Sequence, residues 1–390
     1  MRILICHERF LFRYGADRVF IIIGQRLKAL GHHVTMLAAR YDREVLEEFA
    51  DEIVTLPTPT DYARLDEFCS RWLELAFLPR ARKAGGFDLI IHGGWPLFSA
   101  TEVMGQLAPV VLFLDHGVVP DAGYTPFQQG VLRWVRQLRR THLCHCTHAV
   151  GVSRFVVETQ TIPDAGPGVP VRVILNGTDH LVPPPPPAEE SPEPGAEFAM
   201  VRELAGAGHP LLLNLGRFEA GTYKNSQAVL RLFELVQSAC PEARLLVLEK
   251  ESQLNLPGHL RGSVIPLGFP DDDGLSRIID LVDVGVSLSR WEGFNLPLVE
   301  LLRRGRPALA YRIGAHPEVV PDAWFLCDNL PELAAKATLI LRDPTAAAGR
   351  LSSPAASAHW QYLGWDRFVD ELLAFAQIAP ASPAGLVSLP

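Results

Sequence analysis

The sequence predicts an α/β protein made of two Rossmann-like domains in succession. Short apolar runs alternate with amphipathic stretches in both halves of the chain, the pattern of βαβ units around a parallel sheet. A stretch rich in proline and glutamate, at 181–208, separates the halves. The chain has 390 residues, enough for two domains that each bury a core of their own.

The first half, 1–180, carries the elements of the first domain. Its expected strands are Arg2–Cys6, Val34–Ala38, Glu52–Leu56, Leu89–His92, Val110–Asp115 and Ala149–Ser153. A helix is expected over Ala16–Leu30, because Gly31 follows it in the usual position for ending a helix. The residues that follow the first domain, at 181–208, are expected to form an extended linker, since the prolines at Pro183–Pro187 favour extended, solvated backbone.

The same alternation of apolar runs and amphipathic stretches continues in a second domain, 209–350. Its expected strands are Leu211–Leu215, Arg244–Leu248, Ser263–Pro266, Val284–Leu288 and Ala308–Tyr311. Its expected helices are Asn225–Ser238, Asp273–Leu281, Leu296–Arg304 and Pro331–Leu341. An amphipathic helix is expected at 358–378, and a frayed tail at 379–390, which is rich in Pro, Ala and Ser.

Composition narrows the class of protein. Apolar residues make up 48% and charged residues 21% of the chain, as in a soluble globular protein. The net charge of −8 argues against broad nucleic-acid binding, which needs a basic surface. No apolar run reaches the roughly 18 residues of a membrane span, and Met1–Cys6 is too short for a signal peptide, so a cytoplasmic location is expected. Six scattered cysteines fit reduced, mostly buried thiols.

Two carboxylates, Glu292 and Glu300, frame the segment that follows the apolar run Asp283–Leu288. Pro297 falls in the expected first turn of a helix, where proline is tolerated because the first N–H groups have no intrahelical partner. Those N–H groups and the helix dipole favour an anion such as a diphosphate. Both carboxylates would then reach polyol hydroxyls on either side of a bound phosphate.

This segment, Glu292-Gly-Phe-Asn-Leu-Pro-Leu-Val-Glu300, resembles the Glu-x7-Glu signature of family 4, the retaining, nucleotide-sugar-dependent group 1 glycosyltransferases. Further segments resemble that family in the right order: Gly15-Ala-Asp17-Arg18, Leu30-Gly-His-His-Val34, Asn176-Gly-Thr-Asp179, Gly216-Arg217 with Lys224-Asn225, and Gly314-Ala-His-Pro-Glu318. The resemblance runs from about residue 1 to about residue 375. It implies the GT-B fold, in which two Rossmann-like domains face each other across a cleft.

The resemblance implies a role for each matched residue of the second domain. Arg217, after the glycine turn at Gly216, and Lys224 would neutralise the departing nucleoside diphosphate. Glu292 would contact hydroxyls of the transferred sugar, and Glu300 the ribose hydroxyls. The other expected contacts with the donor are Gly293, the backbone N–H groups of Phe294, Asn295 and Leu296, and the region from Gly268 to Asp273 for the base. The alternative for each charged residue is an ordinary solvated loop or helix position.

In the first domain, the resemblance points to His116, which follows the strand Val110–Asp115, as a group near the donor sugar and acceptor. Asp115 would orient its ring, and Gly15 would let the first loop approach the phosphate or the acceptor closely. The alternative for His116 is a loop histidine with no role in catalysis. The cluster His142-Leu-Cys-His-Cys-Thr-His148 suggests a metal site, but no second cluster completes it, so no metal is expected.

The resemblance therefore implies a retaining glycosyltransferase that needs neither metal nor cofactor. It would move a hexose or deoxyhexose, with a mannosyl or rhamnosyl group weakly preferred, from a nucleoside diphosphate. The acceptor would be a hydroxyl of a glycan, a lipid-linked molecule or a small molecule. The basic amphipathic stretch 127–140 suggests peripheral contact with the inner face of the membrane, although a half-buried helix with solvated arginines explains it too. A nucleotide-sugar-binding module without turnover, a phosphorylase and an epimerase stay open.

Overall fold

The computed structural model describes residues 1–12, 14–58, 64–181, 195–218 and 221–376. It divides the chain into two compact units. Of the described residues, unit 1 holds those in Met1–Asp121, those in Thr125–Gly177 and those from Gly364 to Ala376, whereas unit 2 holds those in Ala122–Tyr124 and Thr178–Leu363. Among the described residues, no helix is both long and apolar enough to pass through a bilayer.

Unit 1 is built on a parallel sheet of seven strands in the order β5-β3-β1-β6-β7-β8-β9. Its strands are β1 Arg2–Cys6, β3 His33–Ala38, β5 Glu52–Thr55, β6 Leu89–His92, β7 Val110–Asp115, β8 His148–Gly151 and β9 Val171–Val173. A separate pair consists of β2 Arg9–Phe10 and β4 Arg40–Tyr41. The central strand β1 is buried apart from its first residue, Arg2, because it has parallel neighbours on both sides and helices over its faces.

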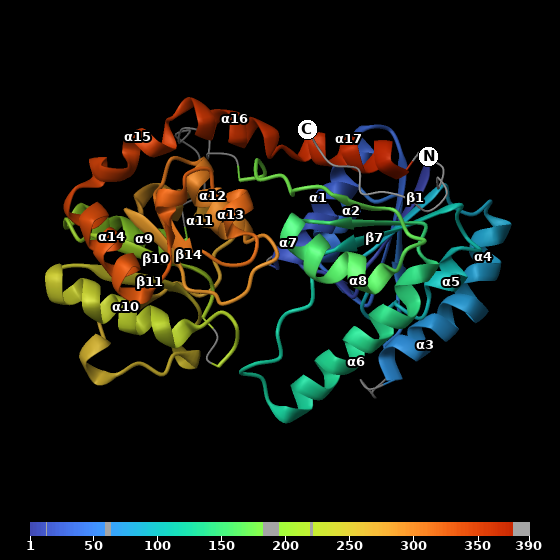
Figure 1. Ribbon diagram of the computed structural model, residues 1–390, viewed down its shortest axis with the longest axis horizontal. Coiled ribbons are helices and arrows are strands. Elements are labelled where there is room, and N and C mark those ends of the chain that lie inside the picture. The colour runs from blue at the N-terminus through green and yellow to red at the C-terminus, as the bar shows by residue number, and fades with distance from the viewer. Residues whose placement is uncertain (13, 59–63, 182–194, 219–220, 377–390) are drawn as a thin grey trace. The chain divides into compact units, whose positions relative to one another are not determined.

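The helices of unit 1 cover this sheet (Figure 1). They are α1 Gly15–Ala29, α2 Arg43–Glu47, α3 Leu65–Trp72, α4 Leu78–Lys83, α5 Thr101–Met104, α6 Pro126–His142, α7 Arg154–Val156, α8 Ile162–Ala165 and α17 Trp365–Ala376. The last of them, drawn in red, returns to pack beside the blue α1. It buries Trp365, Phe368 and Leu372, so the end of the chain completes the first core.

Unit 2 has a parallel sheet of six strands in the order β12-β11-β10-β13-β14-β15. Its strands are β10 Leu211–Arg217, β11 Arg244–Leu248, β12 Val264–Pro266, β13 Val284–Ser287, β14 Ala308–Tyr311 and β15 Leu326–Cys327. Its helices are α9 Ala196–Gly206, α10 Ser226–Ala239, α11 Asp272–Leu281, α12 Leu296–Arg303, α13 His316–Val319, α14 Leu330–Arg342, α15 Ala348–Leu351 and α16 Pro354–Tyr362. The predicted α/β class with two parallel, Rossmann-like sheets is confirmed.

Two predicted segments differ from the structure. The expected linker 181–208 contains the helix α9, which packs against α11 because its apolar side, including Val201, is buried there. The expected single helix 358–378 is two helices, α16 and α17, separated at Leu363 and Gly364 and belonging to different units. Most of the proline-rich stretch, at 182–194, and the expected tail at 379–390 lie outside the described residues.

The order of the strands locates the ligand sites. In unit 1 the winding reverses between β1 and β6, and in unit 2 between β10 and β13. Ligands of such sheets bind beyond the carboxyl ends of the strands at the point of reversal. The carboxyl ends of β10 and β13 therefore mark the candidate site of unit 2: Arg217 is the last residue of β10, and Glu292 follows β13.

Candidate functional site

The carboxyl end of β10 forms one wall of the site in unit 2. The pairing of β10 with β11 shifts in register between Leu213 and Arg217, and Gly216 has a φ of +107°, which an L side chain rarely adopts. The buried amide of Asn214 donates to the carbonyl oxygen of Gly216 over 3.0 Å and holds this bend. The bend leaves Arg217 exposed at the end of the strand.

Lys224 and Glu292 form an ion pair across the point of reversal. Lys224 Nζ lies 2.8 Å from Glu292 Oε1, and only 17% and 8% of the two side chains are exposed. Although burial works against its charge, the Glu292 carboxylate raises the pKa of Lys224 above its usual value, while Arg217 nearby opposes this. The sequence-predicted cations and the first carboxylate thus lie together in one charged cluster.

The loop that carries Glu292 ends at the amino terminus of α12. Asn295 stands at the N-cap with φ 74° and ψ 68°, the left-handed region, and Pro297 lies in the first helical turn as predicted. Phe294 and Leu296 are buried on either side of Asn295. The first N–H groups of a helix have no intrahelical acceptor, so an anion can be bound here.

Glu300 lies one turn inside α12 and is only 5% exposed. Its Oε1 lies 2.8 Å from Nε2 of His180, whose side chain is also buried. The sequence analysis missed His180, although it stands directly after the Asn176-Gly-Thr-Asp179 segment. A buried carboxylate with one neighbouring imidazole keeps acceptor capacity for hydroxyl donors.

In unit 1, His116 follows β7 at its carboxyl end, as predicted, and its ring meets Phe20 edge to face at 5.5 Å. Its Nε2 is buried and has no hydrogen-bond partner among the described residues. Burial, reinforced by the nearby His7, lowers the pKa of His116 to about 4, so the ring is neutral near pH 7. A neutral ring can accept or donate a proton.

The expectation that Asp115 orients the His116 ring is wrong. Both oxygens of Asp115 accept from the buried guanidinium of Arg139, at 2.7 and 2.5 Å, and Thr161 donates to one of them at 2.6 Å. The same guanidinium also pairs with Asp164 at 2.6 Å. Asp115 therefore anchors α6 to the sheet, because a buried arginine needs its charge balanced.

His7 is a second histidine of unit 1 that the sequence analysis missed. It follows β1 directly, its ring stacks on Phe20 at 4.6 Å, and its Nε2 lies 3.4 Å from the buried Asp17. A Cβ added to Gly93 would lie 2.4 Å from His7 Nδ1, so the loop after β6 approaches this ring closely. A signal was available, since His7 directly follows an apolar strand, just as His116 does.

Two family models match the chain, and between them they cover most of it. Glycosyltransferase Family 4 matches residues 14–180, and Glycosyl transferases group 1 matches residues 209–343. The chain is a family 4, group 1 glycosyltransferase. The structure and the two matches agree, because one model falls on unit 1 and the other on unit 2.

Comparisons with individual proteins agree with this family. Trehalose synthase of Rubrobacter xylanophilus is 27% identical over 150 residues, which are 35% of this chain and only 36% of that protein. The solved sucrose-phosphate synthase of Thermosynechococcus elongatus has a TM-score of 0.74 at 18% identity, over 96% of this chain and 98% of that one. Anabaena Alr3699/HepE, solved with UDP and glucose, has a TM-score of 0.70 at 16% identity, over 96% and 99%. The TM-scores show that the glycosyltransferase shares the fold of the two solved structures, and at identities below 25% they show the fold alone.

The structure also places the remaining predicted site residues of the glycosyltransferase. Gly15 is the first residue of α1, and Gly268 follows β12 with φ +61°, its N–H donating to the carbonyl of Glu249. The suggested metal cluster does not lie along one strand, because α6 ends at His142 and β8 begins only at His148. Across the described residues, no group of three or more metal-binding side chains comes together.

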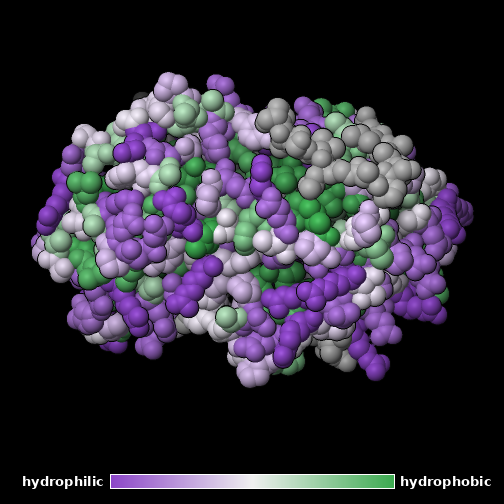
Figure 2. All heavy atoms as spheres, in the orientation of Figure 1, coloured by the Kyte–Doolittle hydropathy of each residue, from purple (hydrophilic) through white to green (hydrophobic). Residues whose placement is uncertain are grey.

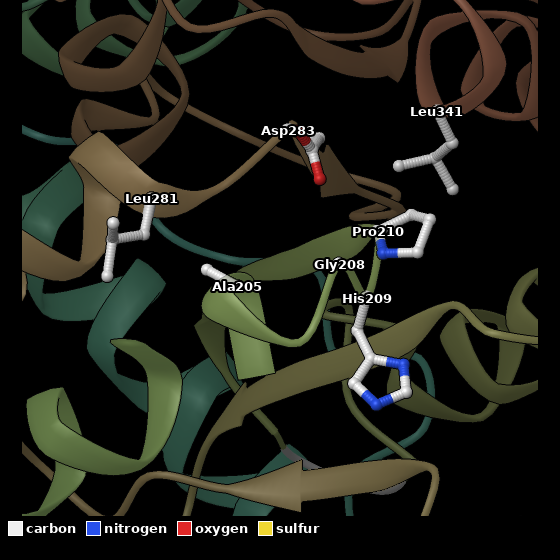
Figure 3. A pocket seen from close by; sticks show the side chains of 7 residues that line it. All are labelled: Ala205, Gly208, His209, Pro210, Leu281, Asp283 and Leu341. Carbon is white, nitrogen blue, oxygen red and sulfur yellow. The ribbon is translucent and has the colours of Figure 1, made fainter. Parts of the chain in front are cut away.

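A pocket in unit 2 lies away from these residues (Figure 3). Its volume is about 250 Å³, and it is lined by Ala205, Gly208, His209, Pro210, Leu281, Asp283 and Leu341. Pro210 and Asp283 directly precede β10 and β13, so the pocket lies at the amino ends of these strands. Ligands of doubly wound sheets bind at the opposite ends, and this pocket is therefore not the candidate site.

Proposed function

We propose that this glycosyltransferase transfers a sugar, with retention of anomeric configuration and without a metal ion, from a nucleoside diphosphate to an acceptor hydroxyl. The observation that carries the proposal is the cluster of Arg217, Lys224 and Glu292 at the point of strand reversal in unit 2. Two cations beside the amino end of α12 suit a diphosphate, and a carboxylate beside them suits sugar hydroxyls.

In the proposed complex, Lys224 keeps one N–H on Glu292 and turns its other two toward the diphosphate. Arg217 shares the negative charge that grows on the diphosphate as the glycosidic bond breaks. Glu300 accepts hydrogen bonds from the two ribose hydroxyls. The acceptor oxygen attacks the anomeric carbon from the face that the diphosphate leaves, and a diphosphate oxygen takes the acceptor's proton. No protein nucleophile is needed, and a catalytic role for His116 of unit 1 stays a prediction.

The substrates are proposed only as classes. The solved relative with UDP and glucose supports a nucleoside diphosphate hexose as donor, and the sucrose-phosphate synthase and trehalose synthase relatives support a sugar acceptor. A mannosyl or rhamnosyl donor and a glycan or lipid-linked acceptor are the alternatives that the sequence itself suggested. The proposed location is the cytoplasm or the inner face of the cell membrane.

An incubation with UDP-, GDP- and dTDP-sugars, with and without candidate acceptors, tests the proposal. We expect nucleoside diphosphate to be released only when a suitable acceptor is present, and the product to keep the donor's anomeric configuration by NMR. Binding without release would favour the alternative of a nucleotide-sugar-binding module. Conversion of the sugar in the absence of an acceptor would favour an epimerase, the activity named for a putative UDP-N-acetylglucosamine 2-epimerase of Listeria monocytogenes that shares the fold.

Peripheral membrane contact through α6 stays a prediction, and the structure changes which residues of α6 could make that contact. Arg139 is buried against Asp115, so it cannot contribute to a basic surface, whereas Arg133 is exposed. Phe127 is 74% exposed near the start of the helix. Hydrophilic residues cover much of the face seen in Figure 2. We expect liposomes with anionic lipid to float the protein, and Arg133→Ala with Phe127→Ala to reduce flotation; unchanged flotation of that variant would contradict the prediction.

A further inference from the structure

A buried polar network lies directly beneath the loop that carries Glu292. It joins Asn295 at the N-cap of α12, Ser287 at the end of β13 and His316 at the start of α13. All three residues are at most 7% exposed. Neither the family assignment nor the proposed function gives His316 or Ser287 a role.

The hydrogen bonds of this network fix the state of the His316 ring. Its Nδ1 lies 2.6 Å from the carbonyl oxygen of Tyr311, which can only accept, so Nδ1 carries the hydrogen. Its Nε2 lies 2.9 Å from Asn295 Nδ2, an amide nitrogen that can only donate, so Nε2 is an unprotonated acceptor. Burial lowers the pKa of His316, which agrees with a neutral ring.

Asn295 uses both hydrogens of its amide. One is donated to His316 Nε2 and the other to Ser287 Oγ over 3.0 Å. The backbone of Asn295 is left-handed, a conformation that is unfavourable for most L-residues and that glycine adopts freely. The two hydrogen bonds from the side-chain amide hold the side chain in place and thereby stabilise this backbone conformation.

The residues just before His316 hold the other end of the same loop. The N–H of Ala315 donates to the carbonyl oxygen of Glu292 over 3.1 Å. Gly314 approaches that oxygen so closely that an added Cβ would lie 2.4 Å from it. The segment from Gly314 to His316 therefore clamps the loop at Glu292 and at Asn295.

We propose that His316 is a positioning residue: its neutral ring holds Asn295 in the left-handed conformation and thereby places Glu292 and the first turn of α12 for the donor. The inference rests on the proposed function for the identity of the ligand. Its structural part, the coupling of His316 to Asn295, does not depend on that ligand.

A double-mutant cycle tests the coupling through turnover. We expect His316→Phe to lower kcat/KM for the donor about tenfold to a hundredfold, because it leaves a buried amide hydrogen without an acceptor. Asn295→Gly supplies the second background of the cycle, because glycine adopts a positive φ without an anchor. In the Gly background, His316→Phe should cost less than about threefold further. An equal loss in both backgrounds would overturn the proposal, as would no loss in the wild-type background.

The matched control is His359→Phe, a partly buried histidine of unit 2 whose Nε2 lies near the carbonyl oxygen of Val319. It should show no coupling to Asn295→Gly. A pH profile gives a second readout, because protonation of His316 would put a hydrogen where Asn295 needs an acceptor. Glu292 favours that protonation and Lys224 opposes it. We expect the acid loss of kcat/KM in the wild type to move to lower pH with Asn295→Gly, and an unchanged profile would contradict the inference.

NMR of the ligand-free protein separates the inference from the proposed function. We expect the His316 ring to show the Nδ1–H tautomer at neutral pH, and its loss in His316→Phe to shift the side-chain amide signals of Asn295. If this holds while no nucleoside diphosphate sugar binds, the proposed function fails and the coupling stands. If the ring shows the Nε2–H tautomer, the inference fails whether or not the donor binds.

Discussion

Replacing Lys224 by Met and Glu292 by Gln, separately and together, distinguishes a ligand-binding pair from a contact that only stabilises the fold. The two charges are 2.8 Å apart and mostly buried, so each single replacement leaves the other group without its partner. If the pair only stabilises the fold, the double replacement should keep nearly normal activity. If the pair binds the donor, the double replacement should lose activity.

The structure gives the size of the effect on stability. Removing one partner of a fully buried ion pair costs about 3–5 kcal/mol. Because 17% of the Lys224 side chain is exposed, solvent screening lowers this cost, and we expect about 2–3 kcal/mol for each single replacement. The double replacement should cost only about 0–1 kcal/mol, since no charge is then left unpaired.

Turnover should follow a different pattern. In the proposed complex, each replacement removes a group that contacts the sugar or the diphosphate, and losses of such groups typically lower kcat about 100-fold or more. The double variant should recover stability without recovering activity. Chemical denaturation followed by tryptophan fluorescence and acceptor-dependent release of nucleoside diphosphate would be measured on the same preparations.

The control pair is Arg43 and Glu47, which lie 3.3 Å apart and one turn apart on α2 but are 72% and 55% exposed. Replacing them in the same way should change stability by less than about 1 kcal/mol and leave turnover unchanged. Substantial turnover by the double Lys224/Glu292 variant would refute the reasoning about the site. Additive stability losses would refute the reasoning about the pair.

Three further predictions follow from buried or site groups. Asp115→Ala should destabilise unit 1 by about 3–5 kcal/mol in denaturation experiments, because the Arg139 guanidinium would keep only one carboxylate; a cost below about 1 kcal/mol would contradict this. The free energy of unfolding should be highest above pH 6.5 and fall as the pH drops below it. Burial lowers the pKa of His92 to about 3 and of His116 to about 4 in the folded protein. Between these values and pH 6.5 the unfolded chain therefore binds protons that the folded protein does not, which favours unfolding. His92→Phe should flatten this fall, and an unchanged slope would count against it. Glu300→Gln should weaken nucleoside diphosphate binding in calorimetry about 10- to 100-fold, yet leave a 2′,3′-dideoxy analogue almost unaffected; equal losses for both ligands would show that Glu300 does not contact the ribose.

The sequence by itself determined most of the fold and the place of the site. Apolar runs separated by amphipathic stretches are local patterns, so strands such as Arg2–Cys6 and helices such as α12 could be predicted almost to the residue. The order of the motifs in the chain identified the family that the two domain models later showed. Glu292, Lys224 and Arg217 could be named as candidates because they stand in segments that resemble the motifs of the family.

Only the tertiary structure decided which side chains meet. The contacts of Asp115 with Arg139, of Glu300 with His180 and of Asn295 with His316 join residues that are 21 or more positions apart. Hydrophobic periodicity carries no information about such pairs, because they depend on how helices pack over the sheet. The helix α9 was missed for a related reason: its neighbourhood is rich in proline, and its burial against α11 outweighs that local signal.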